Sequence, residues 1–81
     1  MRYKKGQRVV CIEDWDWLEV HDTGTVLSEV GEHEHWIPVG WDKESDDLHD
    51  CNGLCEDGHG WFVVDNVIIP YISPIDISEL I

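Results

Sequence analysis

Four residues able to bind a metal lie close together in this sequence, in the order His49, Cys51, Cys55 and His59. Imidazole nitrogen and thiolate sulfur are the ligands that zinc prefers, and four of them complete a tetrahedral shell. His49 and Cys51 are two positions apart and face the same way on an extended segment, while Cys55 and His59 each follow at a spacing of four. Because four protein ligands leave no open coordination position, the spacing predicts a structural zinc site.

Other arrangements of the same residues stay open. The two histidines can hydrogen-bond the backbone of a glycine-rich loop, with Cys51 and Cys55 as buried filling. A disulfide between those cysteines is a second alternative, disfavoured because three cysteines are an odd number and the expected compartment is reducing. A metal can also recruit Asp50, Asp57 or His33 in place of one ligand.

Catalysis is disfavoured by the pattern. A cysteine–histidine pair can act as nucleophile and base, but both cysteines have metal spacing, and the chain has no glycine-rich phosphate loop or serine elbow. We therefore expect no enzymatic activity; a zinc enzyme would need an open coordination position. His33 and His35 alternate at a strand start and are interpreted as solvated, and Cys11 in its apolar run as buried.

The charge is strongly negative. Eighteen acidic and five basic residues give a net charge of −13, and Lys43 is the only basic residue after Arg8. Such a chain repels nucleic acid and anionic membranes and is attracted to basic surfaces. No apolar run approaches the roughly 20 residues of a membrane span. We expect a basic protein partner, with no direct contact to nucleic acid or membrane.

The length of 81 residues indicates a single domain, near the lower limit for an unassisted apolar core, so a stabilising metal is plausible on size alone. A hydrophobic content of 42% is typical of a folded protein. The first residues carry charge without an apolar segment behind them, which predicts no signal peptide and a cytoplasmic location. We expect a monomer.

Short stretches rich in β-branched and aromatic residues predict strands. Glycine and polar turn residues separate them, and helical periodicity is absent from the first half. Pro38 removes a backbone donor, which predicts an edge position or a bulge. Ser73-Pro74-Ile75-Asp76 favours a short helix ending near Leu80, or a tail. The expected strands lie at residues 6–12, 25–28, 36–42, 61–64 and 67–69.

The fold class is therefore mainly β. The order Gly6-x-Arg8-Val9-Val10, Gly24-Thr25-Val26, Val39-Gly40-Trp41-Asp42 and Trp61-Phe62-Val63-Val64 resembles a small SH3-like barrel. The likeness covers residues 6–69 of the single domain 1–81. The metal loop 49–59 is inserted between two late strands, and residues 70–81 form a C-terminal extension with a short helix or tail.

Five tryptophans are many for this length. Trp41 and Trp61 are expected in the core. Trp15, Trp17 and Trp36 are the better candidates for exposure, where tryptophan often dominates a protein interface. Because acids and tryptophans alternate over residues 13–19, Trp15 and Trp17 could share one face if that segment is extended.

The stretch Asp50-Cys51-Asn52-Gly53-Leu54-Cys55-Glu56-Asp57-Gly58-His59-Gly60-Trp61 is similar to glycine-rich segments of small phage-encoded proteins. Among these, the chain resembles the type II-A anti-CRISPR class. The resemblance implies a zinc-bearing inhibitor of a CRISPR-associated RNA-guided DNA nuclease, acting in the cytoplasm of the bacterial host. Inhibition would follow from direct stoichiometric binding that blocks loading of target DNA. The class shares no motif, so no inhibitory residue carries over.

Charge supplies the contact candidates for such an inhibitor, because the nuclease holds its duplex in positively charged channels. They are the acids Glu13, Asp14, Asp16, Glu19, Glu44, Asp46 and Asp47. The alternative function is an SH3-like interaction module of phage origin that binds another host protein through exposed aromatic residues. Salt separates the two, because it weakens docking through charges far more than docking through aromatic rings.

Overall fold

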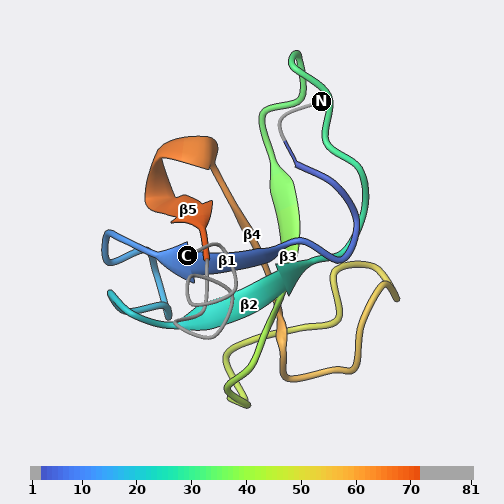
Figure 1. The fold of residues 1–81 in the computed structure, drawn as a ribbon. Coiled ribbons are helices and arrows are strands. Elements are labelled where there is room, and N and C mark those ends of the chain that lie inside the picture. Colours follow the sequence, from blue (N-terminus) through green and yellow to red (C-terminus); the bar gives the residue numbers. More distant parts are fainter. Residues whose placement is uncertain (1–2, 72–81) are drawn as a thin grey trace, which may run out of the picture.

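The computed structural model describes residues 3–71, whose strands form one antiparallel sheet of order β4-β3-β2-β1-β5. Its elements are β1 (Arg8–Cys11), β2 (Thr23–Val26), β3 (Ile37–Trp41), β4 (Gly60–Val63), the 3-10 helix η1 (Asp65–Val67) and β5 (Ile68–Pro70). The sheet curls into a half-barrel (Figure 1). The predicted mainly β, small barrel-type fold is confirmed, and the helix predicted after Ser73 lies outside the described residues.

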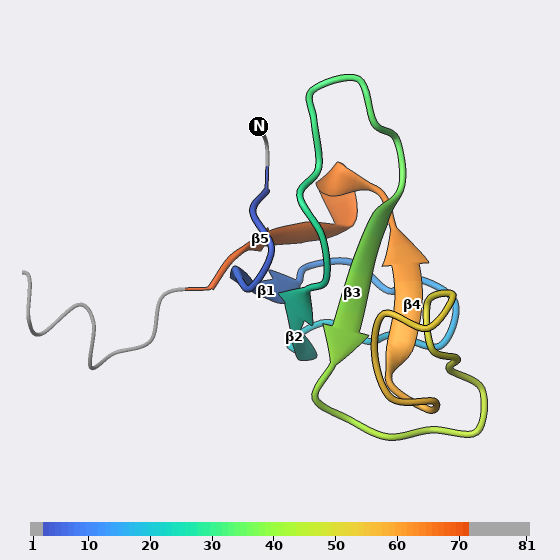
Figure 2. The same ribbon diagram turned by 90° about the vertical axis from the view of Figure 1, so that its right-hand side faces the viewer.

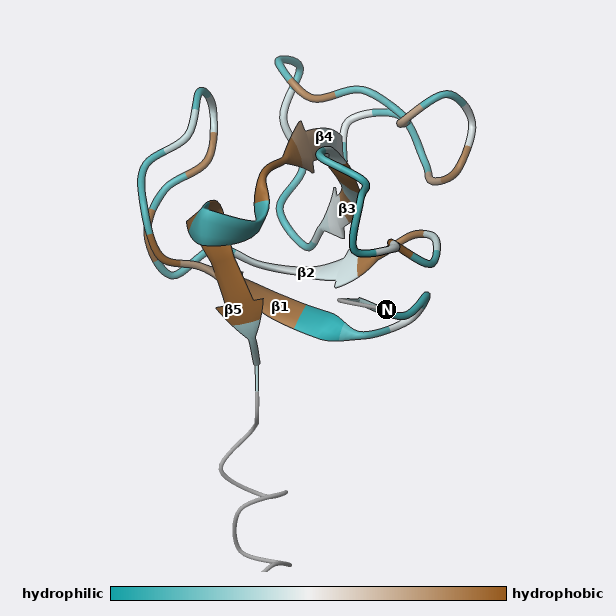
Figure 3. Ribbon diagram, turned by 90° about the horizontal axis from the view of Figure 1, so that it is seen from above, coloured by the Kyte–Doolittle hydropathy of each residue, from teal (hydrophilic) through white to brown (hydrophobic). Residues whose placement is uncertain are grey.

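The core lies inside the curl. Alternate residues of β1 and β2 are buried, as the two-residue period of a strand requires. Cys11 is 1% exposed, which confirms its predicted burial. Figure 3 shows that β1 and β5 are apolar over most of their length. The buried hydrophobic cluster consists of Tyr3, Val9, Cys11, Leu18, Val26, Val30, Ile37, Val39, Trp41, Leu48, Val63, Val67 and Ile68.

Pro38 lies inside the sheet, so its predicted edge or bulge position is wrong. Its strand β3 pairs with β2 on one side and β4 on the other, and Figure 2 shows β3 and β4 side by side. The amide of Leu27 donates to the Pro38 carbonyl at 2.9 Å, and the proline nitrogen has no hydrogen to donate in return. Pro38 lies opposite Leu27, and β2 ends at Val26. The hydrogen bond that proline cannot donate is therefore missing beyond the end of β2.

The β1–β2 loop (residues 12–22) carries a tight turn where acids and tryptophans alternate in the sequence. The backbones of Trp15 and Leu18 exchange hydrogen bonds of 3.1 and 2.9 Å, and Asp16 between them has a φ of 52°. Aspartate tolerates this left-handed conformation better than most residues. Trp15 packs against the core, whereas Trp17 is 52% exposed, so the two indoles do not share one environment.

Candidate functional site

An aromatic pocket of about 400 Å³ lies beside β4. Four segments that are distant in the sequence build it: the β1–β2 loop, the residue before β3, the β3–β4 loop (residues 42–59) and β4 itself. Because Trp36 is 52% exposed, the pocket has a solvent-facing wall. Its lining residues, called the aromatic pocket below, are Trp15, Asp16, Trp36, His49, Trp61 and Phe62.

Hydrogen bonds between these segments hold the pocket walls. Trp15 Nε1 donates to the Phe62 carbonyl at 3.2 Å, and Trp61 Nε1 donates to Asp16 Oδ2 at 3.2 Å. The rings of Trp15 and Trp36 lie 6.4 Å apart at 52°, a tilted pairing favourable for aromatic rings. Two of the three indole donors are therefore used within the protein, and the turn at Asp16 is fixed to β4.

His49 contributes its imidazole ring to the pocket. The amide of Cys51 donates to His49 Nδ1 at 2.8 Å, so in this arrangement the ring proton is on Nε2. The His49 ring centre lies 5.1 Å from that of Trp61 and 5.7 Å from that of Phe62. The backbone of His49 pairs with Gly60, which ties the β3–β4 loop to the start of β4.

Asp16 supplies the negative charge of the pocket. Its Oδ2 accepts the bond from Trp61, and its Oδ1 accepts no hydrogen bond from the described residues. No lysine or arginine lines the pocket. Lys43 is held elsewhere, 2.8 Å from Asp22 Oδ2 and donating to the Trp17 carbonyl at 2.6 Å. The site therefore combines aromatic walls with one exposed carboxylate.

No family model, curated protein or solved structure matches this chain. The likeness to type II-A anti-CRISPR proteins stays a prediction. Within residues 3–71, no helix is both long enough and apolar enough to cross a membrane.

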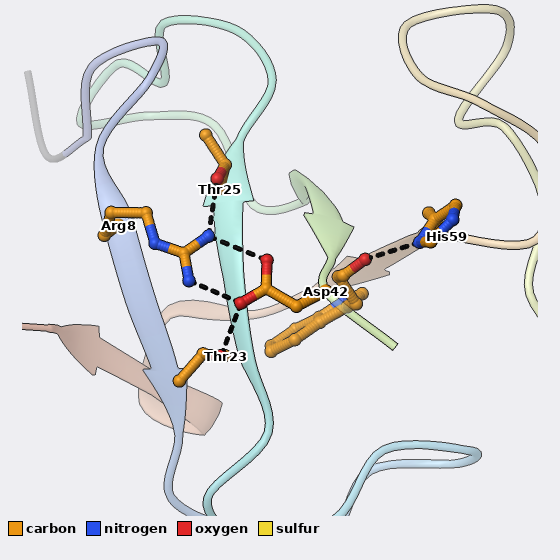
Figure 4. A network of polar contacts seen from close by, with 6 residues as sticks. Arg8, Thr23, Thr25, Asp42 and His59 are labelled. Carbon is orange, nitrogen blue, oxygen red and sulfur yellow. Dashed lines mark hydrogen bonds and ion pairs between the residues drawn. The ribbon is translucent and has the colours of Figure 1, made fainter. Parts of the chain in front are cut away.

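The two histidines of the predicted zinc site bond to the backbone. His59 Nδ1 donates to the Trp41 carbonyl at 2.8 Å, a contact drawn in Figure 4, and its Nε2 lies 3.7 Å from Glu44 Oε2. His49 accepts from an amide, as described above. These contacts correspond to the alternative in which histidines hydrogen-bond the backbone of a glycine-rich loop.

The two cysteines differ in burial. Cys51 is fully buried, with its Sγ 3.9 Å from the Val39 carbonyl, and burial raises its pKa to about 12. Cys55 is half-buried, and its Sγ contacts the Glu56 carbonyl at 3.5 Å. Both are free thiols, without the alternative disulfide.

Taken together, the four predicted ligands do not assemble in this arrangement. Among residues 3–71, no group of three or more His, Cys, Asp or Glu side chains is placed to hold a metal ion. His33 and His35 are exposed, and His35 packs edge-on against Trp36 with ring centres 5.1 Å apart. Zinc stays a prediction from the sequence spacing, and the pocket does not depend on it.

The predicted contact acids are all exposed on two loops. Lys43 belongs to the β3–β4 loop and bonds to Trp17 and Asp22 of the β1–β2 loop. Lys43 therefore joins the two loops. The β1–β2 loop carries Glu13, Asp14, Asp16 and Glu19, and the β3–β4 loop carries Glu44, Asp46 and Asp47.

The tryptophan predictions hold for three residues and fail in part for two. Trp41 is 1% exposed, as expected, and Trp17 and Trp36 are each 52% exposed. Trp61, expected to line the core, is only partly buried; it packs against the core and also lines the pocket, and Trp15 is only partly exposed. Sequence reasoning also missed Phe62 as a wall residue. The signal was present, because Trp61 and Phe62 are adjacent on a strand next to a buried Val63.

Proposed function

We propose that this protein is an interaction module that binds an exposed basic segment of a partner protein, with one side chain of that segment seated in the aromatic pocket. The observation that carries the proposal is the pocket itself, which is lined by three tryptophans, a phenylalanine, a histidine and one carboxylate. Clustered tryptophans in a cleft are typical of the residues that dominate binding energy at protein interfaces.

The charge of the molecule favours a basic occupant. The chain has eighteen acidic residues and five basic residues, and two of the basic residues, Arg8 and Lys43, are each paired with an acid. A net negative protein accelerates encounter with basic partners and disfavours acidic ones. Asp16 places one negative charge at the pocket, with no base lining it.

Short capped peptides test the proposal directly. A basic peptide containing arginine and lysine, an acidic glutamate peptide and a neutral proline–leucine peptide would be titrated into the protein. Chemical shifts of the five indole N–H groups report where each peptide binds. Trp36→Ala removes a pocket wall, and Trp17→Ala is the matched control, because both indoles are 52% exposed but Trp17 is outside the pocket.

We expect the basic peptide to shift the indole signals of Trp15 and Trp61, and Trp36→Ala to weaken its binding roughly tenfold. Trp17→Ala should bind like the unaltered protein. The proposal is wrong if the basic peptide does not bind, if the neutral or acidic peptide binds more tightly, or if the two tryptophan variants bind equally.

A second candidate function is stoichiometric inhibition of a CRISPR-associated RNA-guided nuclease by blocking target DNA loading. It is favoured by the exposure of all seven predicted contact acids on two joined loops. Those loops could dock on the basic channels that hold the guide–target duplex. Such an inhibitor acts in the cytoplasm of the bacterial host.

This second candidate is tested by adding purified protein to a type II-A nuclease before target DNA and measuring DNA loading. Neutralising Glu44, Asp46 and Asp47 to their amides should restore loading, and inhibition should weaken as ionic strength rises. Trp36→Ala, which leaves those acids intact, should still inhibit. Unchanged loading in the presence of excess protein would exclude the inhibitor function.

A further inference from the structure

We propose that the side chain seated in the aromatic pocket is an arginine, and that Asp16 is the residue that selects its guanidinium. This inference rests on the proposed function and narrows it from a basic segment to one cation. It follows from three properties of the site: the nature of its walls, the unused oxygen of Asp16 and the size of the pocket.

The walls favour a cation. The face of an aromatic ring carries negative potential, which attracts a cation placed over tryptophan. Trp15 and Trp61 have their indole N–H groups bonded to Phe62 and Asp16, so those donors are not available to an anion or a carbonyl. Of the ring N–H groups in the pocket, those of Trp36 and His49 alone are then left for a neutral or negative guest.

Asp16 is held ready to pair with that cation. Its carboxylate is tied to β4 through Trp61 Nε1 and Oδ2, and Oδ1 has no hydrogen-bond partner among the described residues. The left-handed backbone at Asp16, with φ of 52°, is a conformation that aspartate tolerates, and in this turn the carboxylate lies beside the rings of the pocket.

Arginine fits these features better than lysine. A guanidinium is flat and weakly hydrated, so it can stack on a ring while donating sideways to a carboxylate. An ammonium is compact and strongly hydrated, and it loses more hydration on entering an aromatic site. A pocket of about 400 Å³ also leaves room for the guanidinium together with its aliphatic stem.

The test uses four capped pentapeptides of sequence Gly-Ser-X-Ser-Gly, in which X is arginine, citrulline, lysine or trimethyl-lysine. Citrulline has the shape of arginine without its charge. Binding is followed by the Trp61 indole N–H signal, since that group donates to Asp16. Asp16→Asn keeps the turn and an oxygen acceptor but removes the charge. Glu13→Gln is the matched control, in the same loop but outside the pocket.

We expect the arginine peptide to bind at least fivefold more tightly than the other three, and Asp16→Asn to lower its affinity roughly tenfold while Glu13→Gln changes it less than twofold. Equal binding of the citrulline peptide, tighter binding of either lysine peptide, or equal effects of the two variants would overturn the arginine assignment. If a lysine peptide binds most tightly and Trp36→Ala still lowers its affinity, the proposed function is supported and only the arginine assignment is wrong.

Discussion

The guanidinium of Arg8 on β1 pairs through both of its terminal nitrogens with the carboxylate of Asp42, the residue after β3 (Figure 4). Arg8 also donates to Thr25 Oγ1 at 2.8 Å, and Thr23 Oγ1 donates to Asp42 Oδ2 at 2.6 Å. Both threonines are on β2, between the two partners. The pair therefore joins three neighbouring strands across one face of the sheet.

Asp42→Asn should lower the free energy of unfolding at neutral pH, because it removes the charge that pairs with Arg8 through two hydrogen bonds. The loss should be only about 1 kcal/mol, because solvent screens this partly exposed pair. Arg8 holds the pKa of Asp42 below its ordinary value of 3.8. The unfolded chain therefore takes up the proton first as pH falls, and the stabilisation is lost as pH drops through the lowered pKa. Urea unfolding of both proteins at several pH values measures this.

The difference in free energy of unfolding between the unaltered protein and Asp42→Asn should be largest at pH values above the ordinary pKa of aspartate. It should vanish in strong acid. Glu13→Gln, an exposed acid outside this network, is the control and should change stability little. A difference that is independent of pH would contradict the role of the Arg8–Asp42 ion pair.

Gly60→Ala should destabilise the protein by about 2–3 kcal/mol. A β-carbon at Gly60 would lie 2.8 Å from both the Cys51 nitrogen and the His49 oxygen, so backbone would have to move. Gly31→Ala is the control, because its β-carbon would lie 3.6 Å from a Glu34 side-chain oxygen, an ordinary contact. Thermal unfolding of both variants measures the difference, and equal stability would show that the β3–β4 loop can shift freely.

The three thiols should react in a fixed order with a disulfide reagent at about pH 8. Cys55 is half-buried and should react in the folded protein, whereas Cys11 and Cys51 are 1% and 0% exposed and should react only on unfolding. Burial raises the pKa of all three, which lowers the reactive thiolate fraction and slows Cys55 as well. Thiol counting with and without urea gives the order.

The same experiment tests the zinc prediction. Reaction of Cys55 that requires prior treatment with a chelator would confirm a bound metal. Reaction of Cys55 at the same rate with and without chelator would instead support the arrangement in which His49 and His59 bond to the backbone. Equal rates for all three thiols in the folded protein would contradict the burial of Cys51.

Lys43→Met should loosen the β1–β2 loop while changing overall stability by less than about 1 kcal/mol. The substitution removes the bond to the Trp17 carbonyl and the ion pair with Asp22. Amide hydrogen exchange should become faster over residues 12–22 and stay unchanged in β1 and β2. Lys5→Met removes the same charge from an exposed position and should leave the loop unaffected.

Strand positions could be predicted because alternation and β-branched residues are local signals. The expected strands at residues 6–12, 36–42, 61–64 and 67–69 each contain or overlap an observed strand, and the one at 25–28 begins two residues late. The position of Pro38 was predicted wrongly, because a missing backbone donor matters only where the neighbouring strand continues. The residues around Pro38 do not reveal where the neighbouring strand β2 ends.

The candidate site could be predicted only in part. Exposure of Trp36 and of the acids follows from composition and pattern, and so does burial of Trp41. The spacing of His49 and His59 predicts a shared metal centre, which stays a prediction; in the structure His49 Nδ1 contacts the Cys51 amide and His59 Nδ1 contacts the Trp41 carbonyl. A spacing shows which side chains can meet, whereas the path of the loop determines which of them do.

The amino-acid sequence by itself determined the mainly β class and the negative charge, because these depend on composition and on two-residue periodicity. Only the tertiary structure decided that Asp16 and Trp61, 45 positions apart, share a hydrogen bond at one pocket. That contact depends on the order of strands in the sheet and on the turn at Asp16. Neither is fixed by the residues adjacent to it in the chain.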